Sequence, residues 1–162
     1  MNRRRWLRPI WTLLLGLFLG VISRWLDLHT QILGNIFSEL AIWILLGTIL
    51  AIYSPTPKRA MANVLPFCLG MLVTYYGMAM VTDGVFHRTI ILGWTVFALC
   101  SPVFAYLAWY GKERGWFSKL IGVGIVTVSF GSSLILFGGP HFYDWIIDGF
   151  LIYLLFVKRI RR

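Results

Sequence analysis

Six long apolar runs dominate this sequence and restrict what the chain can fold into. A helix needs about 20 apolar residues to cross the hydrocarbon core of a bilayer, which is about 30 Å thick. The chain has 162 residues, so six such helices and their short connections use almost all of it. The sequence therefore predicts an all-α, polytopic membrane protein, a compact six-helix bundle in a single domain of residues 1–162. The expected spans are residues 6–23, 35–53, 62–81, 89–109, 118–137 and 141–157.

The positive charges divide unevenly between the two sides of this bundle. With six spans, 13 of the 15 Lys and Arg residues fall on one side, and only Arg24 and Arg88 fall on the other. Loops rich in Lys and Arg stay in the cytoplasm. The sequence therefore predicts a multi-pass protein of the cell (cytoplasmic) membrane with both termini in the cytoplasm. Because the net charge of +9 is loop charge of this kind, we expect the lipid bilayer as a partner and no nucleic acid.

Familiar catalytic and cofactor patterns are missing from the sequence. Cys68 and Cys100 lie inside apolar runs, with no second cysteine or histidine at a zinc-ligand spacing. No nucleophile elbow, phosphate-binding loop or paired metal-ligand motif occurs. The three histidines fall on separate connections, so only convergence in three dimensions would make them ligands of one ion. We expect no metal and no cofactor.

Ionisable side chains inside the last apolar run are the strongest functional signal. His141, Asp144 and Asp148 are spaced i, i+3 and i+7, and they share one face of a helix. Asp148 lies about 15 Å from the inner end of its run, near the middle of the bilayer. A charged group at this depth is costly unless it has a partner or faces a wet cavity, which makes it a functional candidate. The alternative is that Asp148 is protonated, or paired with a neighbouring helix for structural reasons.

More polar groups are expected on the same outer side. Glu39 lies in the outer third of the second run, and Asp83 lies between the third and fourth runs. Both outer arginines, Arg24 and Arg88, are placed to pair with Glu39, with Asp83 or with the aspartates of the last run. Together these groups predict a polar pocket that opens outward.

Two pairs of residues extend this picture. Tyr75 and Tyr76 lie inside the third run, where they either stack on a ring-containing ligand or fill the bundle core. Gly16 and Gly20 form a GxxxG strip in the first run, which packs within the bundle or against a partner subunit. The predicted substrate-binding residues are Glu39, Tyr75, Tyr76, Asp83, Arg88, His141, Asp144 and Asp148.

Two resemblances to known families can be named. Residues 34–76 (GNIFSELAIWILLGTILAIYSPTPKRAMANVLPFCLGMLVTYY) and residues 101–125 (SPVFAYLAWYGKERGWFSKLIGVGI) resemble an uncharacterised bacterial family of small six-span membrane proteins, a domain of unknown function. That resemblance implies membership and topology but no activity. The architecture also resembles the substrate-binding S components of energy-coupling factor transporters. That second resemblance implies a solute pocket open to the outside and docking of a coupling subunit on Gly16 and Gly20.

The leading functional hypothesis is a transport subunit that binds a small solute, with a transmembrane coupling subunit and ATPases supplying the energy. The second hypothesis is a membrane-embedded enzyme that acts on a lipid or lipid-linked substrate through an outer His/Asp group. A third is a non-catalytic assembly subunit, in which the charged residues of the last run only pair helices.

Overall fold

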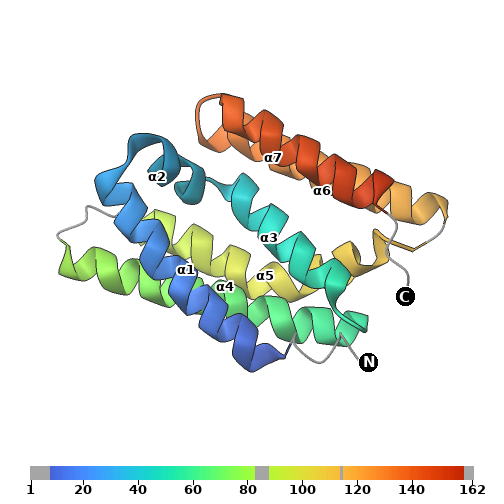
Figure 1. Cartoon of the computed structure of the whole chain (residues 1–162), viewed down its shortest axis with the longest axis horizontal. Coiled ribbons are helices and arrows are strands. Elements are labelled where there is room, and N and C mark those ends of the chain that lie inside the picture. The colour runs from blue at the N-terminus through green and yellow to red at the C-terminus, as the bar shows by residue number, and fades with distance from the viewer. Residues whose placement is uncertain (1–7, 83–87, 114, 159–162) are drawn as a thin grey trace.

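The structure is a computed structural model that describes residues 8–82, 88–113 and 115–158. The described residues form helices and no strand, so the predicted all-α class is confirmed. In Figure 1 the helices lie roughly side by side along the long axis of the molecule. They are α1 (Pro9–His29), α2 (Gln31–Ser38), α3 (Leu40–Tyr53), α4 (Pro57–Val81), α5 (Arg88–Tyr110), α6 (Trp116–Leu136), α7 (Phe142–Ile152) and a five-residue π-helix, η2 (Tyr153–Val157).

Local sequence signals explain most of the helix boundaries. Pro9 and Pro57 occupy the first turns of α1 and α4, where proline loses no helical hydrogen bond. The Thr56 hydroxyl accepts a hydrogen bond of 3.2 Å from the backbone N–H of Arg59 and caps α4. After α6 the chain turns through Gly138 and Gly139, whose φ angles of 78° and 131° are readily adopted only by glycine.

The structure supports fewer membrane spans than the sequence predicts. Among the described residues, four helices, α1, α4, α5 and α6, are long and apolar enough to cross a membrane. The predicted second span is broken into α2 and α3, which bend by 60° and would make a fifth span together. The break falls at Glu39, whose backbone is extended. The predicted sixth span corresponds to α7 and η2, which have 11 and 5 residues, so the count of six remains a prediction.

Helix α3 is the centre of the bundle. Its sequence is apolar on every side, which is typical of a helix buried all round. One side, including Trp43, packs with Val64 and Phe67 of α4, and the opposite side, including Leu45, packs with Leu151 of α7. Figure 1 shows α3 between the α4–α5 layer and the α6–α7 pair. By contrast, α5 and α6 expose many large apolar side chains, as helices facing lipid do.

Helix α1 packs closely against α4 through small residues. Gly16 lies so near the chain of α4 that a Cβ atom placed there would be 2.1 Å from the carbonyl oxygen of Phe67. At Gly20 a Cβ atom would be 2.4 Å from the carbonyl oxygen of Met71. The predicted partner-docking strip is therefore covered by a helix of the same chain, and Gly16 and Gly20 are not available to a partner subunit.

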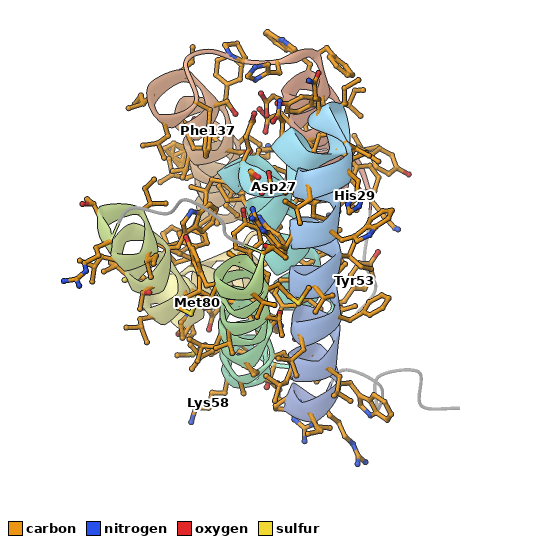
Figure 2. All side chains as sticks on the ribbon, turned by 90° about the vertical axis from the view of Figure 1, so that its left-hand side faces the viewer. Asp27, His29, Tyr53, Lys58, Met80 and Phe137 are labelled. Carbon is orange, nitrogen blue, oxygen red and sulfur yellow. The ribbon has the colours of Figure 1, made fainter. Side chains whose placement is uncertain are left out.

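The ends of the helices define two ends of the molecule. The beginning of α1 and the end of η2 lie at the same end (Figure 1). The opposite end, called the α2 end below, holds α2, the end of α1 and the start of α7 (Figure 1). Asp27 of α1 and Phe137, which follows α6, both lie at the α2 end, which faces the viewer in Figure 2. The candidate functional residues are concentrated there.

Candidate functional site

An ion pair within α1, at the α2 end, is linked to α4 by hydrogen bonds. Arg24 Nη1 lies 2.6 Å from Asp27 Oδ2, one turn further along α1. Arg24 Nε donates a hydrogen bond of 3.1 Å to the hydroxyl of Thr82, and the Tyr75 hydroxyl donates one of 3.2 Å to Asp27 Oδ2. Among the described residues Arg24 pairs with Asp27, so the predicted pairing with Glu39 or with the aspartates of the last run is wrong, whereas Asp83 lies outside the described residues. The i, i+3 spacing of Arg24 and Asp27 is the signal that could have identified the pair.

A cavity of about 230 Å³ lies beside this ion pair. Its polar lining comes from Arg24, Ser38, Tyr75 and Tyr76, which lie on three different helices. Ligand pockets commonly span about 300 to 1,000 Å³, so this cavity fits only a small molecule. Apolar and aromatic side chains form the rest of the wall: Phe37, Trp43, Met71, Leu72, Ala79, Ile90, Trp94 and Phe137.

A second polar group forms where the α2–α3 break meets the start of α7. Glu39 is buried, and its Oε1 accepts a hydrogen bond from the Tyr143 hydroxyl. His141 Nδ1 lies 3.3 Å from Glu39 Oε1 and 3.9 Å from Asp144 Oδ2. Asp144 is fully buried, and its Oδ2 also accepts a hydrogen bond of 2.8 Å from the backbone N–H of His141. Two carboxylates and one imidazole therefore converge from residues about 100 positions apart in the sequence.

Asp148 lies one turn beyond Asp144 on α7 and is 5% exposed. Neither of its carboxylate oxygens has a hydrogen-bond partner among the described residues. The hydroxyl of Ser129 on α6 lies near this carboxylate and is also without a hydrogen-bond partner among the described residues. A charged carboxylate buried without a partner costs free energy. Asp148 does not line the cavity beside Arg24.

The structure thus divides the predicted pocket into separate parts. Tyr75 and Tyr76 line the cavity, whereas Glu39, His141 and Asp144 form the second polar group. Arg88 is exposed at the start of α5 and lines neither described cavity. Asp83 lies outside the described residues.

A larger cavity of about 410 Å³ lies between α3, α4, α5 and α6 and was not foreseen from the sequence. Its walls are apolar except for side chains such as Thr48 and Ser101. Small residues make room for it, because Gly47 and Gly124 both lie in its lining. In the sequence, the small residues that line this cavity are scattered over separate helices, and no periodic pattern connects them.

These features define an all-helical membrane protein with a small polar cavity and a buried carboxylate–histidine group at one end. The chain belongs to the family described as "Family of unknown function (DUF6518)", whose sequence model matches residues 1–138. The identification as a member of a family of unknown function is confirmed. No curated protein and no solved structure matches the chain, so the resemblance to S components gains no support. The matched residues end before α7 begins.

Proposed function

We propose that this protein is a membrane transport subunit that binds a small aromatic carboxylate in the cavity beside Arg24. In this proposal the chain crosses the cell membrane six times with both termini in the cytoplasm, so the cavity opens on the outer side. The charge distribution supports this orientation, because the described Lys and Arg residues toward the α2 end are two, Arg24 near the end of α1 and Arg88 at the start of α5. Partner proteins, a coupling subunit with ATPases, would supply the energy.

The residues that line the cavity are the basis for the proposed ligand. A guanidinium has five N–H donors, and the hydrogen bonds to Asp27 and Thr82 use Nε and Nη1 of Arg24. The remaining donors can hold a ligand carboxylate in the planar, bidentate geometry that arginine favours. Trp43 and Trp94 in the wall offer flat surfaces for a ligand ring. An arginine next to aromatic walls therefore suits a small molecule with one ring and one carboxylate.

Benzoate titrated into the detergent-purified protein is expected to change the tryptophan fluorescence, because Trp43 and Trp94 line the cavity. Arg24→Lys is expected to weaken this binding at least about tenfold, since it keeps a charge beside Asp27 but loses the fork of donors. Arg88→Gln is the matched control, because it removes an exposed arginine at the same end and should leave binding unchanged. Benzylamine, which carries the opposite charge, should not bind. Equal benzoate affinity in wild type and Arg24→Lys would contradict the assignment of the cavity.

The large apolar cavity favours a second candidate function, an enzyme acting on a lipid or lipid-linked substrate. A space of about 410 Å³ with apolar walls can take part of an acyl chain. This candidate predicts that a defined lipid co-purifies with the protein and that Gly124→Phe, which fills the cavity, removes it. Gly124 is suitable because nothing lies within 4 Å of a Cβ atom placed there. The same lipid content in wild type and Gly124→Phe would argue against it.

A further inference from the structure

We propose that Glu39, His141 and Asp144 bind a divalent transition-metal ion of the zinc class at the α2 end. This site is separate from the cavity beside Arg24, and neither proposal depends on the other. The sequence contains no short-range ligand motif, and we therefore expected no metal from it. The fold supplies instead the three-dimensional convergence that such a site needs, with one ligand from the α2–α3 break and two from the start of α7.

The distances between the donor atoms fit a small tetrahedral ion. Ligand atoms at 2.0 to 2.2 Å from a tetrahedral zinc ion lie about 3.3 to 3.6 Å from one another. His141 Nδ1 is 3.3 Å from Glu39 Oε1 and 3.9 Å from Asp144 Oδ2, and one donor atom from each residue lies within 4.8 Å of the other two. Shifts of a few tenths of an ångström at His141, together with a small rotation of the carboxylates, would place the three donor atoms at three corners of a tetrahedron around the ion. The fourth position would be left for water or a substrate.

Charge and burial give an independent reason for a cation here. Glu39 is 4% exposed and Asp144 is fully buried. The second oxygen of each carboxylate, Glu39 Oε2 and Asp144 Oδ1, has no hydrogen-bond partner among the described residues. Two carboxylates held this close repel each other, and the N-terminus of α7 supplies only about half a positive charge. A divalent ion bound by Glu39 Oε1 and Asp144 Oδ2 would neutralise the charge of both buried carboxylates.

The identity of the ligands favours zinc over magnesium or calcium. Imidazole is a good ligand for zinc and other late transition metals, whereas magnesium and calcium prefer sites made of oxygen atoms alone. The Tyr143 hydroxyl donates to Glu39 Oε1, which orients that carboxylate as outer-shell partners of metal sites do. The His141 side chain is 45% exposed, so an ion can reach the site from the surface.

The test is zinc binding by the full-length protein, purified with a histidine-free tag and treated with chelator. Titration calorimetry is expected to show one zinc ion per chain, and magnesium should not compete. His141→Asn is expected to weaken zinc binding by at least about 100-fold, the upper end of the loss seen when only an outer partner is removed. Asparagine is a good helix N-cap, so α7 should still form. His29→Asn is the matched control, because it removes an exposed histidine at the same end and should keep full affinity.

A second measurement does not depend on any variant folding. Cobalt added to the wild-type protein is expected to give the intense visible absorption of a four-coordinate site, which zinc then displaces. Binding of zinc with equal affinity in wild type and His141→Asn would overturn the proposal. A weak, six-coordinate cobalt spectrum, or the absence of zinc binding by folded wild-type protein, would overturn it equally.

Discussion

Replacing Gly16 with alanine is expected to lower the free energy of unfolding by about 3 kcal/mol or more. The added Cβ atom would lie 2.1 Å from the carbonyl oxygen of Phe67 and 2.9 Å from its carbonyl carbon. Both are backbone atoms, so no side chain can rotate away, and α1 and α4 must move apart where Gly16 meets α4. Thermal unfolding in detergent should therefore show a strongly lowered midpoint, or no folded protein.

Gly131→Ala is the matched control for this prediction. Gly131 also lies inside a long helix, α6, but nothing lies within 4 Å of a Cβ atom placed there. Because alanine is a better helix former than glycine, this variant should be as stable as the wild type or slightly more stable. If Gly16→Ala unfolds at the same temperature as Gly131→Ala, the close contact between α1 and α4 is wrong.

Asp27→Asn is expected to lower the free energy of unfolding by about 2 to 3 kcal/mol. Removing one partner of a buried ion pair costs about 3 to 5 kcal/mol, because the other charge is left buried and unpaired. Arg24 is 8% exposed, whereas the side chain of Asp27 is 28% exposed, so we expect a value below that range. The variant also removes a charged acceptor of the Tyr75 hydroxyl, and with it a link between α1 and α4.

The double variant Arg24→Gln, Asp27→Asn separates charge pairing from side-chain packing. Because it leaves no unpaired charge at the pair, it should recover most of the stability that Asp27→Asn loses. The measurement is the unfolding midpoint of the wild type, both single variants and the double variant in the same detergent. A double variant that loses as much stability as the two single variants added together would show that the two side chains are not coupled.

Long apolar runs and their flanking charges were enough to predict the class of the protein. A segment of about 20 apolar residues has few alternatives to a membrane helix, because only a helix satisfies all of its own backbone groups in lipid. The apolar run of residues 35–53 likewise indicated a helix, and α3 forms within it. These inferences depend on local sequence alone.

The candidate sites could be predicted only in part, because each depends on contacts between distant segments. Tyr75 and Tyr76 were identified as candidates, but their cavity is formed with Arg24, a residue assigned other partners from the sequence. Glu39 and Asp144 were also identified, yet as members of one pocket with the tyrosines. No spacing rule connects a residue at a helix break to one at the start of a helix about 100 positions later.

The sequence by itself determined an all-helical membrane protein and the helix face shared by Asp144 and Asp148. The tertiary structure decided which helices touch: it placed Gly16 against α4, broke the second apolar run at Glu39 and brought that carboxylate to His141. The physical reason is that hydrophobicity and helix formation are properties of short segments. Packing order and the pairing of buried charges are decided by the free energy of the whole bundle.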